Sequence, residues 1–374
     1  MAERLPDPKT EIRMTTLRAT RGANYWSRRP ITRLDLSIGA YENISSVDVP
    51  GVTQSLLSTM PGLRDHGCSI GEPGGFIIRL KRGTYFAHIV EHVALELQDM
   101  IGHEVGYGRT RGGDVAGEYT IVVEHLHEAV GLRAAALAFE IVQCAFAGTL
   151  SSVEHAVAEL SALAATPNVP PLLQHVLCGI TGGRSRNQTR DELVRLGFQE
   201  SDLIVDVSPS YLLQAGLPYS RSDIAIIMDA DLSDVPERYR EPPRAQRLVS
   251  VVADAVPENG IVIVPAKEWE VQDTVRDAGC RVSIFAADDD VTRKDKKVAG
   301  ACATVVDRRI MIEQFDNVVE AGWVHDKTSP QAQVAARLAA FTLNELQPTY
   351  PSRSEMINHE RSGSHSSERA GVAD

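Results

Sequence analysis

Two histidines and a glutamate in the segment AHIVEHVALELQ, residues 87–98, have the types and spacing of a metal-dependent hydrolytic centre. In a helix, residues three and four apart lie on one face, so His88, Glu91 and His92 are neighbours. Two imidazoles spaced in this way reach one tetrahedral Zn²⁺, and the carboxylate between them is placed to deprotonate a water on that ion. The pattern H-x-x-E-H therefore predicts a zinc site with Glu91 as the catalytic base.

A catalytic zinc needs a third protein ligand. Glu96 lies one turn further along the same helix face, and Glu124 lies on the predicted strand in TIVVEHLHE. We favour Glu124, taken from a separate element, because Glu96 is then available to orient a histidine. The alternative interpretation of the motif is a solvated helix face whose histidines pair with neighbouring carboxylates.

Two further segments are candidates for binding substrate. Arg109 and Arg111 in GYGRTRGG can hold substrate carboxylates by bidentate hydrogen bonds, and the alternative is an exposed basic turn. Gly74 and Gly75 either let the backbone approach a ligand or make a turn.

These segments belong to a predicted α+β domain over residues 31–150. A strand begins at residue 34, a short helix lies between two Pro-Gly breaks, and CSIGEPGGFIIRLKRGT predicts a Gly-rich loop, a strand and a turn. The histidine helix spans about residues 85–100, a strand lies within 117–128, and an Ala-rich helix ends near Gly148. The arginine-rich residues 1–30 are predicted to be a flexible basic arm.

The second half of the chain has a different pattern. Residues 151–171 end in ATPNVPP and predict a linker. Strands alternate with helices of ten or more residues over 172–346, which predicts a doubly wound, mostly parallel sheet. Residues 347–374 are predicted to be a disordered tail. The fold class is therefore α/β, with an α+β N-terminal domain.

Composition limits the possible partners. The net charge of -12 and pI near 5.4 argue against nucleic acids and anionic membranes, whose phosphates this chain would repel. We find neither a signal-peptide core nor an apolar stretch of the roughly 18 residues that span a bilayer. Five scattered cysteines suggest no disulfide framework, so we expect a cytoplasmic protein.

Residues from about 34 to 148 resemble the N-terminal domain of cyanophycin synthetase. The resemblance is carried by LDLSIGAYE, PGLRDHGCSIGEPGGFIIRLKRGTYFAHIVEHVALELQ, VGYGRTRG and GEYTIVVEHLHEAVG. The family makes an insoluble polymer with an aspartate backbone and arginine side groups. The resemblance implies a domain that holds this polymer and, in some members, cuts it at a zinc site on the histidine helix. The family's ATP-grasp domain has no room here between residues 151 and 171.

Residues 172–346 resemble the central domain of the Mur ligases, with HVLCGITGGRSRNQT in the place of its phosphate loop. The nucleotide chemistry is missing from this resemblance. Arg184, Ser185, Arg186 and Asn187 replace the Gly-Lys-Thr core, Asp206 stands where the family has a metal-binding glutamate, and Lys267 stands where a carboxylate is expected. We therefore expect no ATP binding and no Mur C-terminal domain after this region.

Three functions remain open, and we rank them in this order. The first is a zinc-dependent hydrolase of cyanophycin or a related aspartate/arginine peptide. The second is a non-catalytic cyanophycin-binding or regulatory subunit that works beside a full-length synthetase, because an acidic surface suits a polymer rich in guanidinium groups. The third is an ATP-dependent ligase with a reworked nucleotide site. A homo-oligomer is expected because closed symmetry is common.

Overall fold

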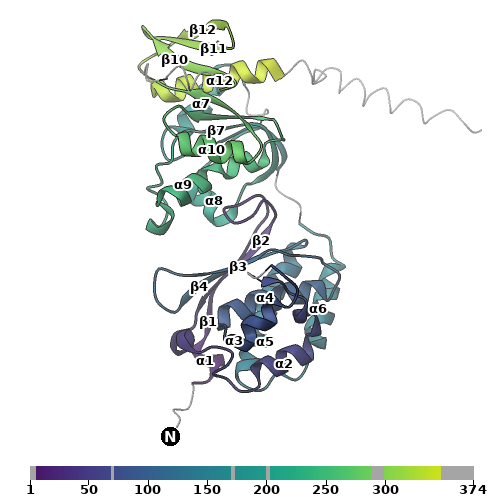
Figure 1. Ribbon diagram of the computed structural model, residues 1–374. Coiled ribbons are helices and arrows are strands. Elements are labelled where there is room, and N and C mark those ends of the chain that lie inside the picture. Colours follow the sequence, from purple (N-terminus) through teal and green to yellow (C-terminus); the bar gives the residue numbers. More distant parts are fainter. Residues whose placement is uncertain are drawn as a thin grey trace, which may run out of the picture. The chain divides into compact units, whose positions relative to one another are not determined.

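The computed structural model describes residues 6–68, 71–169, 173–198, 203–287, 291 and 299–346 (Figure 1). The chain forms two compact units. The first comprises Met1–Val176, Val207–Ser222 and Ala230–Ala255, and the second comprises Leu177–Asp206, Asp223–Asp229 and Val256–Asp374.

The first unit contains a four-stranded antiparallel sheet. Its strands are β1 (Arg13–Thr20), β2 (Ile31–Ser37), β3 (Gly108–Gly112) and β4 (Glu118–Glu124), in the order β1-β2-β4-β3. β2 pairs with β4 in a register that runs from Ile31 opposite Glu124 to Ser37 opposite Glu118. Leu34 and Leu36 of β2 are part of the buried core of the unit, because residues two apart in a strand face the same side of the sheet.

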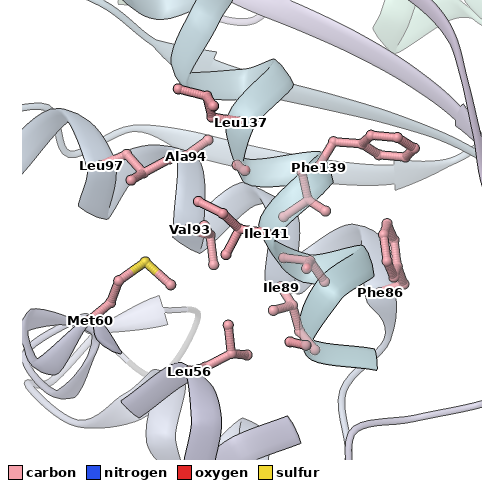
Figure 2. Packing of buried hydrophobic residues seen from close by; sticks show 14 of the residues in the cluster. Leu56, Met60, Phe86, Ile89, Val93, Ala94, Leu97, Leu137, Phe139 and Ile141 are labelled. Carbon is pink, nitrogen blue, oxygen red and sulfur yellow. The ribbon is translucent and has the colours of Figure 1, made fainter. Parts of the chain in front are cut away.

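Five helices complete the core of this unit. They are α2 (Val52–Thr59), α3 (Gly75–Arg82), α4 (Phe86–Asp99), α5 (Glu128–Phe146) and α6 (Glu154–Ala164). Helices α4 and α5 pack against each other and against the sheet. Figure 2 shows Ile89 and Val93 of α4 beside Ile141 of α5, with Leu56 of α2 nearby. This packing fixes α4, the helix that carries the two histidines.

Helix α5 is the Ala-rich helix that was expected to close the domain. It is long and apolar enough to cross a membrane by length and composition, contrary to our expectation that no stretch would be. However, 67% of its most apolar window is buried inside the unit. Its apolar surface therefore serves as the core of a folded domain.

Three predicted boundaries differ from the structure. The arm predicted at residues 1–30 contains α1 (Pro8–Glu11) and β1, and β1 pairs along its length with β2. The linker predicted at 151–171 contains α6, whose Leu160 is buried in the first core and whose Glu159 pairs with Arg133 of α5. The strand predicted after Gly75 is the helix α3, because the buried Phe76 and Leu80 are four residues apart and lie on one helix face. The predicted tail, residues 347–374, lies outside the described residues.

The predicted fold of the second half is confirmed as a mostly parallel sheet. Its eight strands have the order β12-β11-β10-β9-β8-β7-β5-β6. They are β5 (Leu173–Thr181), β6 (Ile204–Val207), β7 (Tyr219–Ile227), β8 (Ile261–Pro265), β9 (Arg281–Phe285), β10 (Cys302–Val306), β11 (Arg309–Gln314) and β12 (Asn317–Trp323). The β7–β8, β8–β9 and β9–β10 pairs are parallel, whereas β10, β11 and β12 form an antiparallel end that the sequence analysis did not predict.

In the described part of this half, five α-helices lie between or after these strands. They are α7 (Arg186–Arg195), α8 (Pro209–Ala215), α9 (Pro242–Val249), α10 (Trp269–Asp277) and α12 (Pro330–Leu346). Helices α7 and α12 pack together in the second unit, whereas α8 and α9 fall within the segments that group with the first unit.

Candidate functional site

Helix α4 buries almost all of its surface, including its polar face. Taken as whole residues, Glu91, His92 and Glu96 each expose at most 7% of their surface. A solvated helix face, our alternative interpretation of the motif, therefore does not describe these three residues. Buried polar groups of this kind need specific partners.

His88 presents both ring nitrogens to defined neighbours. Its Nδ1 lies 2.7 Å from the hydroxyl oxygen of Thr84, one turn before it, and its Nε2 lies 3.3 Å from Sγ of Cys68. Burial, with the nearby Arg79, lowers the pKa of His88 to about 4. The imidazole is therefore neutral near pH 7 and can act as a metal ligand.

His92 lies between an aromatic ring and a third histidine. Its ring stacks on Phe76 of α3 with centroids 3.9 Å apart, and its Nδ1 lies 2.9 Å from Nδ1 of His66. Burial, followed by the charges of His88 and His66, lowers its pKa to about 2. Its Nε2 is buried and has no hydrogen-bond partner among the described residues.

Glu91 is held by strand β3. Thr110 of β3 donates a 2.5 Å hydrogen bond to Oε2 of Glu91. A Cβ on Gly108 would lie 2.8 Å from Cγ of Glu91, so the close approach of β3 to α4 requires glycine there. Burial raises the pKa of Glu91 to about 7, and the Thr110 bond and Arg109 oppose this shift. A carboxyl group with this pKa exchanges protons readily near neutral pH.

These side chains line a pocket of about 680 Å³ in the first unit. Its walls come from the loop before α3, from α3 and α4, from the segments that follow these two helices, and from β3 and β4. The residues that line it are His66, Gly67, Cys68, Arg79, Thr84, Tyr85, Ala87, His88, Glu91, His92, Leu95, Asp99, Val105, Gly106, Gly108, Arg109, Thr110 and Tyr119. Charged, hydroxyl and aromatic groups thus surround the candidate base.

Cys68, His88 and His92 form a candidate metal-binding group. One potential ligand atom from each lies within 4.8 Å of the others. A thiolate with two imidazoles is a ligand set that Zn²⁺ accepts in catalytic sites. The unpartnered Nε2 of His92 also fits, because a metal would satisfy a buried lone pair that the described residues leave without a partner.

The third ligand suggested by the sequence lies elsewhere. The carboxylate of Glu124 is 3.1 Å from Arg29, and this side chain belongs to neither candidate metal-binding group among the described residues. Strand β4 ends at Glu124, and the carboxylate of this residue forms an ion pair with Arg29. Glu96 lies closer to the histidines, because its Oε2 is 3.1 Å from Nε2 of His66. His66, Glu96 and Asp99 form a second candidate group.

Of the four predicted substrate-binding residues, Arg109 lines the pocket and the other three do not. Arg109 is exposed and lines the pocket, whereas Arg111, two residues further along β3, is exposed outside it. Gly74 and Gly75 begin α3 and do not line the pocket. Gly74 has a φ of 86°, which favours glycine, so its role in the structure is to start the helix.

Sequence reasoning missed Cys68 and His66. Both occur in RDHGCSIG, the loop segment that precedes the histidine helix. The one available signal was a histidine two residues before a cysteine near a metal-type helix. That signal has no fixed spacing to the H-x-x-E-H motif, so only the packing of this loop against α4 brings the residues together.

The predicted phosphate loop in the second unit is already filled by a carboxylate. The backbone N–H groups of Gly183 and Arg184 donate to Asp229 at 2.8 Å and 3.1 Å. Asp206, at the position of a metal-binding glutamate, lies 2.6 Å from Arg190. Backbone donors and a carboxylate that could serve a nucleotide and its Mg²⁺ are thus engaged within the chain.

A family model for the cyanophycin synthase-like N-terminal domain matches residues 33–147. This part of the chain is therefore similar to the N-terminal domain of cyanophycin synthases. The match covers most of β2, strands β3 and β4, the histidine helix and α5, but not β1, and it confirms the resemblance found in the sequence. The candidate metal-binding group and the pocket therefore lie within the region that this family model matches.

Curated relatives match part of the chain. A cyanophycin synthetase of Trichormus variabilis is 42% identical over 136 residues, which cover 35% of this chain and 15% of the relative. The Synechocystis enzyme is 45% identical over 115 residues, covering 30% and 13%, and that of Crocosphaera subtropica is 37% identical over 172 residues, covering 45% and 19%. The chain thus spans less than a fifth of the length of these relatives.

Solved structures outside this family are more distant. A murein peptide ligase from Psychrobacter arcticus aligns with a TM-score of 0.34 and 11% identity, covering 46% of this chain and 44% of that chain. A MurF ligase from Thermotoga maritima aligns with a TM-score of 0.30 and 12% identity, covering 45% of each chain.

Proposed function

We propose that the cyanophycin synthase-like domain is a zinc-dependent hydrolase that cuts amide bonds in cyanophycin or a related aspartate/arginine peptide. The observation that carries the proposal is the convergence of Cys68, His88 and His92 beside Glu91 in one pocket. Cys68, His88 and His92 would hold the ion, which supplies a water of lowered pKa and polarises the scissile carbonyl.

The roles of the other residues follow from their contacts. Glu91 accepts the proton of the attacking water, because its raised pKa lets it exchange protons near pH 7, and Thr110 orients its carboxylate. Arg109 and Arg79 add positive charge to the lining of the pocket, which suits the carboxylates of an aspartate-rich substrate. The proposal places the protein in the cytoplasm, consistent with five cysteines that form no disulfide in the described part of the chain.

The test is the release of soluble product from insoluble cyanophycin. The purified chain with added Zn²⁺ should release arginine- and aspartate-containing peptides, and a chelator or His92→Ala should abolish the release. A folded, zinc-supplemented protein that releases nothing would overturn the hydrolase. Metal content, measured on the same samples, separates loss of zinc from loss of chemistry.

A binding or regulatory role is the second candidate. The net charge of -12 favours it, because an acidic surface attracts a polymer that carries guanidinium groups. In that case the protein should co-sediment with insoluble cyanophycin without cutting it, and added salt should weaken the association. A binding subunit would act beside a full-length synthetase, as a monomer or as a homo-oligomer.

The ligase function is disfavoured by the filled phosphate loop. We expect no saturable binding of Mg²⁺-ATP in calorimetry, because Asp229 already accepts from the loop's N–H groups and Arg190 pairs with Asp206. Asp229→Asn and wild-type protein should both give no binding heat, since the loop also lacks the lysine of nucleotide sites. Saturable ATP binding by the wild type would contradict this prediction.

A further inference from the structure

We propose that Glu96 and His66 form a relay that fixes the tautomer of His92 and leaves the lone pair on its Nε2. The relay is a property of the metal-free protein, and only its consequence for metal affinity rests on the proposed zinc site. Glu96 and His66 are thus positioning residues, because they act on the metal through His92.

The three side chains form a continuous line of contacts. Oε2 of Glu96 lies 3.1 Å from Nε2 of His66, and Nδ1 of His66 lies 2.9 Å from Nδ1 of His92. Both distances are within the range of hydrogen bonds. The side chains of His66 and Glu96 are 12% and 8% exposed, and His92 is 4% exposed, so water competes little for these contacts.

With an ionised Glu96 and neutral rings on His66 and His92, the ring protons can be placed along these contacts in one way. A carboxylate only accepts hydrogen bonds, so His66 must donate from Nε2 and keep its lone pair on Nδ1. The Nδ1 of His92 must then donate to that lone pair. His92 has no second ring proton, so its Nε2 carries a lone pair.

The alternative arrangements put a proton on Nε2 of His92. They require either a protonated Glu96 or a doubly protonated His66, and each turns the buried Nε2 of His92 into a donor. That donor would have no acceptor among the described residues. Buried N–H groups without an acceptor are rarer in native proteins than acceptors without a donor. The relay leaves an acceptor in that place, which a metal ion can use.

The surroundings hold the line in place. Phe76 stacks on the ring of His92, with an angle of 22° between the planes, which restricts its rotation. A Cβ on Gly62 would overlap the carboxylate of Glu96, so glycine there makes room for the relay's acceptor. A fixed carboxylate–histidine arrangement behind a metal ligand typically contributes 10- to 100-fold to metal affinity.

The test reads the tautomer directly in the metal-free protein, with the whole 374-residue chain. Histidine labelled with ¹⁵N gives long-range ¹H–¹⁵N correlations that identify the protonated ring nitrogen, and a His92→Gln spectrum assigns the signal. We expect wild-type His92 to be protonated on Nδ1. Glu96→Gln should shift it toward Nε2, because an amide can donate to His66 and reverse both bonds, and should lower Zn²⁺ affinity about 10- to 100-fold.

Glu104→Gln is the matched control, because Glu104 is exposed just beyond α4 and undergoes the same chemical change. Wild-type His92 protonated on Nε2 would overturn the relay, and that spectrum decides the question even if Glu96→Gln does not fold. An unchanged tautomer and Zn²⁺ affinity in a folded Glu96→Gln protein would also overturn it. The expected tautomer without any Zn²⁺ binding would keep the relay and refute the zinc hydrolase.

Discussion

Replacing Glu91 with glutamine is expected to lower the rate of cyanophycin hydrolysis by roughly 10²- to 10⁴-fold, the usual contribution of a general base. Glutamine keeps the size of the side chain and can still accept the hydrogen bond from Thr110. It cannot accept a proton from water at neutral pH. Glu91 is absent from the candidate metal-binding groups, so zinc content should be retained. The measurement is the initial rate of soluble product release, with zinc content determined on the same protein.

Glu140→Gln is the control for this change, because Glu140 is an exposed carboxylate on α5 outside the pocket. It should release product at the wild-type rate. A Glu91→Gln protein that keeps zinc and cuts the polymer at the wild-type rate would show that another group takes the proton. A protein that loses zinc together with activity would instead assign Glu91 a structural role at the site.

Acidification is expected to destabilise the first unit through His125. This histidine directly follows β4 and is 3% exposed. Its Nδ1 lies 3.0 Å from the hydroxyl oxygen of Thr32. A Cβ added to Gly131 would lie 2.5 Å from the Cβ of His125. Burial lowers the pKa of His125 to about 4, partly opposed by Glu128.

The sign follows from the protons bound in each state. Between about pH 6.5 and pH 4 the unfolded chain binds the proton on His125 and the folded chain does not, so stability falls as the pH falls. The folded state should lose about 2 kcal/mol from this group at pH 5 and about 3 kcal/mol below pH 4, relative to pH 7. Urea midpoints across this pH range measure the loss.

His125→Asn removes the titrating group and keeps a polar atom near Thr32. This variant should be less stable at pH 7 but should show a shallower decline of stability with acid. His155→Asn, at an exposed position on α6, is the matched control and should keep the wild-type slope. An unchanged slope in His125→Asn would contradict the assignment of this part of the acid sensitivity to His125.

Local pattern accounts for the elements that the sequence analysis identified. The periodicity of AHIVEHVALELQ predicted α4, and the alternation in GEYTIVVEHLHE predicted β4. The succession of strands and helices of ten or more residues predicted the mostly parallel sheet of the second half. Prediction from local pattern was wrong where tertiary packing decided the structure. The segment after Gly75 is a helix that buries Phe76 and Leu80 on one face, and β1 is ordered because it pairs with β2.

The sequence by itself determined the spacing of His88, Glu91 and His92, because residues on one helix keep their relative positions in any fold. It also determined the loss of the lysine in the phosphate loop. Only the tertiary structure decided which other groups join the histidines. Cys68 and His66 lie in a loop whose position depends on its packing against α4. Glu124 forms an ion pair with Arg29. Ligands from separate elements depend on long-range packing, which helix periodicity does not encode.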